Sequence, residues 1–151
     1  MRVLVQRVRK AAVRVDDAVC GEIGPGALLL VGISRGDTEA DVTFLARKVA
    51  ALRIYDDAEG KLNADIGSVP GGAFLAVSQF TLYGDCRKGN RPSYIEAAPA
   101  EEGRAQFERF VHALVGLGHR VETGRFQEQM LVSLENDGPV TLLLESRGRG
   151  S

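Results

Sequence analysis

The chain has 151 residues, of which 44% are hydrophobic and 26% are charged, and its formal net charge is −1. These proportions are ordinary for a globular protein, and the length predicts one domain with a sizeable core. The charge balance excludes a strongly basic nucleic-acid binder, because most affinity of that kind comes from neutralising phosphates, although a local basic patch stays open.

No apolar run approaches 18 residues, and Met1-Arg2 leads directly into a strand-like stretch. We therefore expect neither a membrane span nor a signal peptide. The two cysteines, Cys20 and Cys86, do not have Cys-x-x-Cys spacing, and no histidine cluster completes a zinc site. The sequence predicts a reduced, cytoplasmic protein without a structural metal.

Short strands separated by turns are predicted for the first part of the chain. Asp16-Asp17 and Gly24-Pro25-Gly26 are typical turn sequences, and apolar residues alternate or run together between them. The pattern is that of a meander. The predicted strands cover residues 3–8, 13–15, 21–23 and 27–32.

Two amphipathic helices follow. Thr38 is a good N-cap with Asp41 three residues on, and apolar residues at helical spacing predict a helix over 39–52. Pro99 opens a second helix over 100–117, which the nearby glycines end. The apolar face of this second helix is predicted to contain Phe107, Phe110, Val111, Leu114 and Val115.

Between and after the helices, the sequence predicts strands and two loops. Residues 63–72 form a loop, and residues 83–98 show no periodicity and predict a long ordered loop, which is often functional in a compact domain. The remaining predicted strands cover residues 53–55, 73–77 and 121–123.

A hairpin is predicted near the end of the chain, with strands at 130–134 and 140–144. Its tip contains Gly138-Pro139. One interpretation is an ordinary turn. The other is a cis peptide bond, which is inexpensive before proline and turns the flanking carbonyls to one side, where they would accept an ammonium group.

These elements predict one α+β domain over residues 1–146, with curved, mainly antiparallel sheets and helices on one side. Residues 147–151 are a basic, glycine-rich tail that we expect to be disordered. There is no Gly-x-Ser-x-Gly elbow, and the glycines at 21–26 have the wrong spacing for a nucleotide cofactor. His112 and His119 are expected to be structural or solvated, so a Ser-His-Asp triad is hard to build.

Two segments carry a resemblance to a known family. Ser78-Gln79-Phe80-Thr81-Leu82, followed later by Asn136-Asp137-Gly138-Pro139-Val140-Thr141, closely resembles the D-aminoacyl-tRNA deacylases of the Gly-cisPro type. The resemblance covers residues 1–146. Further matching segments are residues 1–8, 87–93 and 122–126.

The resemblance implies a barrel-like, layered β/β/α fold working as a homodimer on the acceptor end of aminoacyl-tRNA, without metal, cofactor, DNA or membrane. It also implies that the catalytic pocket lies around residues 78–82 and that the ribose 2′-hydroxyl of the tRNA assists the attack.

From the residues we expect the N–H groups of Phe80 and Thr81 to form an oxyanion hole, with Ser78 and Gln79 positioning the substrate. Two other interpretations of this segment stay open. Thr81 would be a direct nucleophile, although no general base for it is visible. Alternatively, the segment is a buried strand end with hydrogen-bonded Ser and Thr side chains.

For Gly138 and Pro139 the resemblance implies a cis dipeptide that reaches into the pocket of the partner subunit. Its carbonyl groups would hold the α-amino group of the substrate, so that an L side chain collides and a D side chain points away. Glycine has no side chain to exclude.

Phe126 and Met130 match positions that line the family's pocket near the terminal adenosine, and both would equally serve as core residues. Stacking on a base is a suitable role for Phe126. Gln127 and Glu128 depart from the smaller residues common in the family at these positions.

Arg87, Lys88 and Arg91 form a basic cluster within the long loop. The cluster either contacts phosphates of the tRNA acceptor end or is an ordinary solvated loop. Cys86 and Asn90 replace the Thr and Arg typical of the family, which would weaken tRNA affinity through this loop.

The sequence thus predicts a D-aminoacyl-tRNA deacylase. Two rival functions remain open: a non-catalytic RNA-binding module that uses the loop at 87–91, and a general esterase that uses Thr81.

Overall fold

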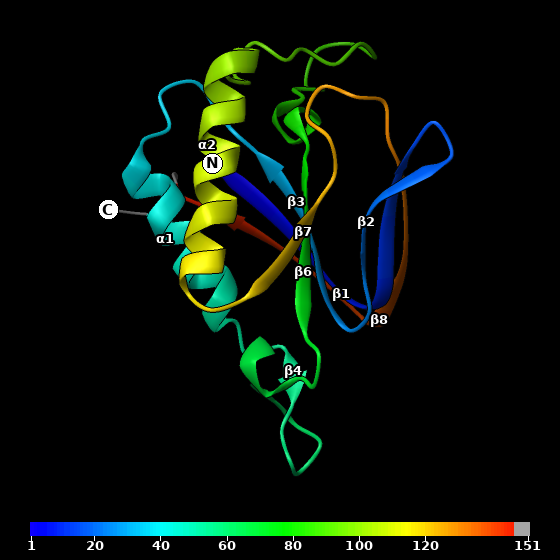
Figure 1. Cartoon of the computed structure of the whole chain (residues 1–151). Helices are drawn as coiled ribbons and strands as arrows, with labels where there is room; N and C mark the ends of the chain where they lie inside the picture. Colours follow the sequence, from blue (N-terminus) through cyan, green and yellow to red (C-terminus); the bar gives the residue numbers. More distant parts are fainter. Residues whose placement is uncertain (147–151) are drawn as a thin grey trace.

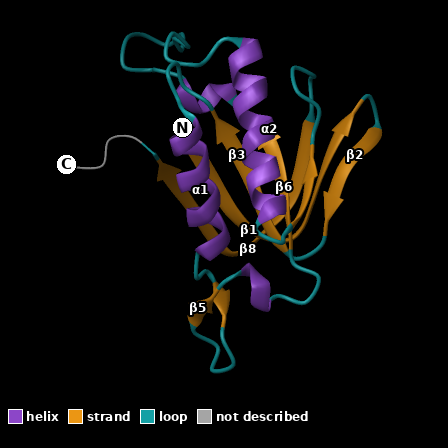
Figure 2. Ribbon diagram, turned by 60° about the vertical axis from the view of Figure 1, so that its left-hand side comes forward, coloured by secondary structure: helices purple, strands orange, loops and turns teal. Residues whose placement is uncertain are grey.

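The computed structural model describes residues 1–146, so the tail at 147–151 lies outside the described residues. The described strands form a six-stranded mixed sheet, curved into a nearly closed barrel, and a small two-stranded sheet. Two helices lie side by side on one face of the curved sheet (Figures 1 and 2). The predicted α+β class with barrel-like sheets is confirmed.

Strand β1 (Arg2–Val15) contacts three other strands. Its first part pairs antiparallel with β3 (Gly26–Gly32) and its last part with β2 (Ala18–Ile23). The prediction of two separate strands here is wrong, because the chain passes Arg9 and Lys10, which are both exposed, without leaving the sheet. One strand therefore serves two parts of the barrel.

Strands β3, β6 (Ala73–Ser78) and β7 (Arg120–Thr123) run parallel to one another. Parallel neighbours need a crossover, and each crossover here contains a helix. Helix α1 (Glu39–Ala51) connects β3 with β6, and α2 (Ala100–Gly116) connects β6 with β7. The carboxyl ends of β3 and β6 consequently meet at one edge of the sheet.

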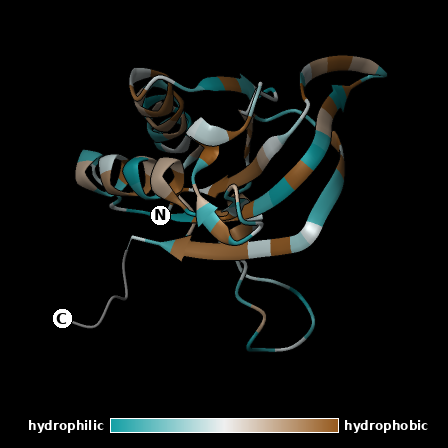
Figure 3. Ribbon diagram, turned by 90° about the horizontal axis from the view of Figure 1, so that it is seen from below, coloured by the Kyte–Doolittle hydropathy of each residue, from teal (hydrophilic) through white to brown (hydrophobic). Residues whose placement is uncertain are grey.

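The residues of β3 and β6 are buried on both faces of the sheet, which explains their nearly continuous apolar sequences. Leu29 and Phe74 face the cluster under the helices, whereas Leu28 and Leu75 face the cluster inside the barrel. Strand β1 instead alternates buried and more exposed residues over 2–5 and 11–15, and Figure 3 shows alternating bands of hydropathy on the strands.

Both helices form close to their predicted bounds. The Thr38 N–H donates to the Asp41 carboxylate at 2.8 Å and fixes the start of α1. In α2, Phe107, Phe110 and Leu114 are buried as predicted. Val115 is 51% exposed, so its placement on the apolar face is wrong, because it lies about 100° around the helix from Leu114.

The connections contain more structure than the sequence predicts. Strands β4 (Tyr55–Asp56) and β5 (Leu62–Ala64) pair with each other, and a short 3₁₀ turn, η1 (Ile66–Ser68), follows. The long loop predicted over residues 83–98 is confirmed from residue 84 onward. Among residues 1–146 no helix combines the length and the apolar character needed to cross a membrane.

The predicted hairpin near the end of the chain is wrong. A single strand, β8 (Leu131–Glu145), pairs antiparallel with β1 on both sides of residues 137–140. Thr141 pairs with Gln6, and Asn136 pairs with Val8, so residues 137–140 bulge from the ladder opposite a single residue. We call residues 137–140 the Gly-Pro excursion. Its Gly138–Pro139 peptide bond is cis.

Candidate functional site

The segment that follows β6 turns sharply beside the end of β3. The Gln79 N–H donates to the Val31 carbonyl at 2.8 Å, and a 3₁₀ turn, η2 (Phe80–Tyr83), begins directly afterwards. Gly32 makes this approach possible, because a Cβ there would lie 3.0 Å from the Leu82 side chain and 3.2 Å from the Gln79 carbonyl oxygen. The close packing fixes the position of η2 at the edge of the sheet.

A cavity of about 630 Å³ opens at this edge. Its walls come from the end of β6, the first turns of α2 and the segment that precedes β8. Among the residues predicted for the site, five line this cavity: Ser78, Gln79, Phe80, Phe126 and Met130. Two side chains from far along the chain therefore meet the 78–80 segment in one hollow.

Phe126 packs against three residues of α2. Its ring packs against the ring of Phe107 with centroids 6.4 Å apart, and the guanidinium of Arg104 lies 5.0 Å from the centroid of the Phe126 ring. Gly103 lets the helix approach, since a Cβ there would stand 3.6 Å from the tip of the ring. Phe126 is half-buried, so it both packs on the core and presents a surface to the cavity.

Met130 is similarly half-buried, and it packs on the cluster inside the barrel. Gly124 faces its sulfur, where a Cβ would come within 2.6 Å of the Met130 Sδ. The two proposed roles of Phe126 and Met130, core residue and pocket wall, are therefore compatible in this fold.

The Thr81 side chain does not line the cavity. Its hydroxyl oxygen accepts a hydrogen bond from the Gln79 side-chain amide. Neither histidine reaches this region: His119 meets the ring of Phe74 edge-on at 5.5 Å, and His112 lies in the groove between α1 and α2.

The Gly-Pro excursion is anchored by two side chains. Arg7 donates to the Asp137 carbonyl at 3.1 Å and to the Ile54 carbonyl at 2.8 Å. The Asn136 amide donates to the Arg7 and Val140 carbonyls at 2.9 and 3.0 Å, which closes the base of the excursion. Gly138 has φ 118°, a region that favours glycine.

The excursion and the cavity lie at opposite ends of the sheet. Asn136 pairs with Val8, which pairs with Gly26, and Gly26 lies beside Ala73 at the start of β6. Ser78 ends the same strand, about 17 Å farther at ~3.3 Å per residue. Figure 1 shows the same separation between η2 and the β4 end, where Ile54 meets Arg7. One chain alone does not bring Gly138 and Pro139 to its own cavity.

Arg87, Lys88 and Arg91 are exposed on the loop at 84–98 and do not line the cavity. Arg87 donates two side-chain hydrogen bonds to the Asp85 carboxylate, at 2.9 and 2.7 Å. These hydrogen bonds lower the pKa of Asp85 to about 2. Part of the cluster's positive charge is therefore already compensated.

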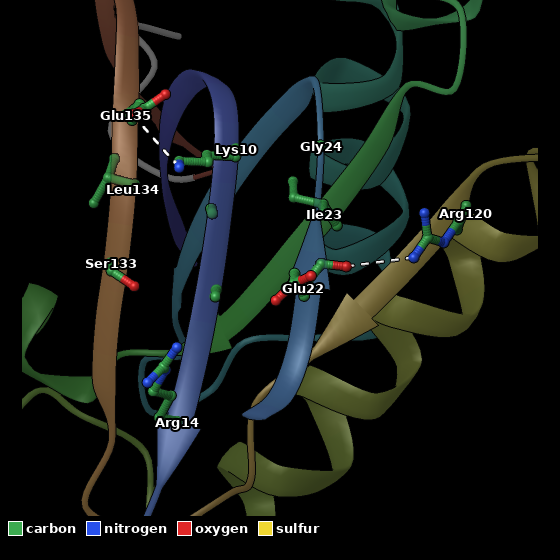
Figure 4. A pocket seen from close by; sticks show the side chains of 11 residues that line it. Lys10, Arg14, Glu22, Ile23, Gly24, Arg120, Ser133, Leu134 and Glu135 are labelled. Atoms are coloured by element: carbon green, nitrogen blue, oxygen red, sulfur yellow. Dashed lines mark hydrogen bonds and ion pairs between the residues drawn. The ribbon is translucent and has the colours of Figure 1, made fainter. Parts of the chain in front are cut away.

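A larger hollow of about 760 Å³ lies over β1, β2 and β8 (Figure 4). Lys10 faces the Glu135 carboxylate at 3.8 Å, and Arg120 donates to the carbonyl of Glu22 at 3.3 Å. None of the predicted site residues lines this hollow. We therefore treat the smaller cavity as the candidate site.

The sequence did not single out Arg7, Gly103 or Arg104. Arg7 lies opposite the excursion only because of the β1–β8 register, and Arg104 reaches Phe126 only because α2 crosses above it. No local sequence pattern predicts either of these two contacts. Within residues 1–146, no group of three or more His, Cys, Asp or Glu side chains is arranged to hold a metal ion.

Comparisons with known proteins agree with this architecture. The family described as D-Tyr-tRNA(Tyr) deacylase matches residues 4–145. A D-aminoacyl-tRNA deacylase from Desulfitobacterium hafniense is 54% identical over 146 residues, which are 97% of this chain and 97% of that protein. One from Shouchella clausii is 55% identical over 97% of this chain and 99% of that protein.

Two solved structures are similar in fold. The c-Myc DNA Unwinding Element Binding Protein has a TM-score of 0.91 and 36% identity over 98% of this chain and all of that one. A probable eukaryotic D-amino acid tRNA deacylase has a TM-score of 0.81 over 95% of this chain and 98% of that one, and at 19% identity it supports the fold alone. By its match over almost its whole length, the chain belongs to the D-Tyr-tRNA(Tyr) deacylase family.

Proposed function

We propose that this chain hydrolyses the ester bond between a D-amino acid and tRNA, releasing the free amino acid and the tRNA. The names of the relatives that share more than half of its residues support this activity. The observation that carries the proposal is the cavity at the end of β6, where residues 78–80 meet Phe126 and Met130.

The proposed chemistry depends on the backbone. Phe80 and Thr81 are the first residues of η2, and N–H groups at the start of such a turn have no acceptor within it. Both would donate to the oxyanion that forms when water attacks the ester carbonyl. Ser78 and Gln79 would position the acyl group beside them.

The attacking water loses its proton with the assistance of the ribose 2′-hydroxyl, and the tetrahedral intermediate collapses by expelling the 3′-oxygen of the ribose, which takes up a proton. No protein side chain acts as nucleophile in this scheme. The terminal adenosine would lie against Phe126 and Met130, where an aromatic ring offers stacking worth about 1–3 kcal/mol per base.

Chiral selection would come from a second copy of the chain. The partner subunit's Gly138 and the partner subunit's Pro139 would enter the cavity and accept the α-ammonium group through their carbonyl oxygens. An L side chain would then collide with this rigid backbone, whereas a D side chain points away and glycine has nothing to exclude. The separation of excursion and cavity within one chain supports this arrangement.

The free side of β8 supports a homodimer. In the described chain β8 pairs only with β1, so its second edge is open. Leu131, Leu142 and Leu143 on this strand are exposed. Proteins normally cover long apolar edge strands, and a second copy would do so here.

Arg87, Lys88 and Arg91 would contact phosphates of the acceptor end. Because Arg87 is already paired with Asp85, the larger part of this contact would fall to Lys88 and Arg91. A modest phosphate contact is consistent with a formal net charge of −1 for the chain.

A deacylation assay on tRNA charged with a D-amino acid, its L enantiomer or glycine tests the proposal. We expect rapid hydrolysis of the D ester, measurable hydrolysis of the glycyl ester and none of the L ester above the spontaneous rate. A non-catalytic RNA-binding module would slow ester loss or leave it unchanged, and equal hydrolysis of the D and L esters would contradict chiral selection.

A further inference from the structure

Two aromatic side chains remain in solvent beside the candidate site. The chain has six Phe, three Tyr and no Trp. Phe80 and Tyr94 are 56% and 39% exposed, and they are the aromatic members of the exposed large hydrophobic residues in the described chain. Their rings contact each other, with centroids 5.1 Å apart and planes at 71°. Exposed apolar side chains that gather in this way mark a binding surface.

The loop at 84–98 holds Tyr94 in place. Asp85 and Ser93 exchange backbone hydrogen bonds of 2.7 and 2.9 Å, and the Ala97 N–H donates to the Tyr94 carbonyl at 3.1 Å. Gly84 lets the ring approach the chain, since a Cβ there would lie 3.1 Å from the Tyr94 Cε1. The ring is therefore positioned before any ligand arrives, which lowers the entropy cost of binding.

The pair stands at the mouth of the cavity. Phe80 is part of the cavity wall, whereas Tyr94 lies outside it on the loop that also carries Lys88 and Arg91. Because the ring planes stand at 71°, the two rings meet edge to face and do not stack on each other. The pair therefore keeps an aromatic face free for a planar ligand. Cations on the same loop favour a ligand with phosphates.

We propose that Phe80 and Tyr94 form a stacking platform for the base of the nucleotide that precedes the terminal adenosine of the tRNA. This inference rests on the proposed function, which puts the aminoacyl ester and the terminal adenosine inside the cavity. The preceding nucleotide then lies just outside, where the platform is. Single-stranded nucleotides are bound by stacking on aromatic side chains, with little dependence on base identity.

Two short substrates test the platform. One is D-aminoacyl-adenosine, and the other is a trinucleotide that ends in the same aminoacylated adenosine and carries two cytidines before it. The measured quantity is the ratio of kcat/KM for the trinucleotide to kcat/KM for the adenosine substrate. In the unsubstituted protein this ratio exceeds one, because the longer substrate also stacks.

We expect Tyr94→Leu to lower this ratio about fivefold to a hundredfold, as expected for one lost stacked base. Tyr94→Phe keeps the ring and should restore most of the ratio. Ile95→Ala is the matched control, since Ile95 is the next residue, is 77% exposed and does not line the cavity. Its ratio should equal that of the unsubstituted protein.

The outcomes separate the platform from the proposed function. An unsubstituted protein that hydrolyses neither of these substrates nor D-aminoacyl-tRNA contradicts the proposed function, and the platform falls with it. Hydrolysis of both substrates with an unchanged ratio in Tyr94→Leu overturns the platform alone. An equal loss in Ile95→Ala would also overturn it, because a general effect of the loop would then explain the data.

A second measurement does not depend on turnover. Because the chain has no tryptophan, Tyr94→Trp introduces a single fluorescent reporter into the platform. We expect an uncharged trinucleotide to quench its fluorescence in a saturable manner and adenosine alone to leave it nearly unchanged. Saturable quenching by adenosine alone, or no quenching by the trinucleotide, would overturn the proposed position of the stacked base.

Discussion

The hydroxyl of Thr81 is the side-chain nucleophile that the sequence leaves open, and its surroundings argue against that role. Its oxygen accepts a hydrogen bond from the Gln79 amide, a group that cannot take up a proton. It also does not line the cavity, and both histidines lie elsewhere. A hydroxyl without a general base is a weak nucleophile.

Thr81→Ala therefore distinguishes the backbone mechanism from a general esterase. Removing the hydroxyl deletes one hydrogen-bond partner of Gln79, which costs about 1 kcal/mol and should lower kcat/KM for the D ester by about tenfold or less. Loss of a true nucleophile would instead lower kcat by about 10⁴-fold or more. Thr43→Ala on α1, in the groove away from the cavity, is the control.

Gly138 is the second residue whose replacement is informative. At φ 118° an L side chain is strained, and a Cβ there would lie 2.9 Å from the Arg7 Nη2 and 3.0 Å from the Val140 Cγ2. Strain of this kind costs about 1–3 kcal/mol. We expect Gly138→Ala to fold but to lose activity on the D ester or its preference for D over L.

Circular dichroism and thermal unfolding report the fold of this variant, and parallel D and L deacylation assays report its selectivity. Gly60→Ala is a matched control, because Gly60 also has a positive φ, at 77°, but meets nothing within 4 Å. Unchanged activity and selectivity in Gly138→Ala would contradict the assignment of the excursion to the site.

At the scale of the elements, the loop at 84–98 depends on charge at its first turn. Arg87 holds the Asp85 carboxylate and lowers its pKa to about 2, below the ordinary value of about 3.9. The folded loop therefore binds fewer protons at Asp85 than the unfolded chain. The contribution of this pair is fully present above about pH 4 and is lost as the pH falls through about 2.

A carboxyl ¹³C titration by NMR checks this expectation. The midpoint for Asp85 should lie near 2 in the unsubstituted protein and should rise towards about 3.9 in Arg87→Ala. A midpoint near 4 in the unsubstituted protein would show that the pair does not form in solution, and the account of a partly compensated basic cluster would then be wrong.

Strand β8 is an element that the local sequence does not predict correctly. Its two apolar halves around Gly138-Pro139 have the residues typical of a hairpin. No local sequence feature distinguishes a hairpin from a single strand with a bulge at this place. The difference lies in β1, more than 110 residues away, which pairs with both halves. The helices were predictable because their apolar spacing and caps are local.

The candidate site also has one part that the local sequence predicts and one part that it does not. The 78–82 segment follows a strand that the sequence predicts well, so its place at a strand end was accessible from local pattern. The meeting of Phe126 and Met130 with this segment depends on α2 and on the parallel β6–β7 pair. In the sequence, only the family resemblance points to those two residues.

For the whole molecule, the main consequence is that one chain carries two separated parts of the proposed site. Mixed dimers test whether they act across subunits. Ala100→Trp would fill the cavity, because Ala100 lines it at the exposed start of α2. Gly138→Ala leaves the cavity open and alters the excursion. Each variant alone should lack D-specific deacylation.

Co-refolding equal amounts of the two variants gives about half mixed dimers if assembly is random. In a mixed dimer, the open cavity of the Gly138→Ala subunit would receive the intact excursion of the Ala100→Trp subunit. One of its two sites then works, so about a quarter of the D-specific activity should return. A site built within one subunit predicts no recovery.

The reciprocal mixture gives the opposite contrast. A chain with both substitutions, co-refolded with the unsubstituted chain, leaves no working site in a mixed dimer if the site is shared, because each cavity or its incoming excursion is altered. About a quarter of the activity then remains, all from unsubstituted dimers, whereas a site within one subunit leaves about half. Recovered activity in the first mixture, together with a quarter of the activity in the second, supports the shared site. No recovered activity in the first mixture, together with half of the activity in the second, rejects it.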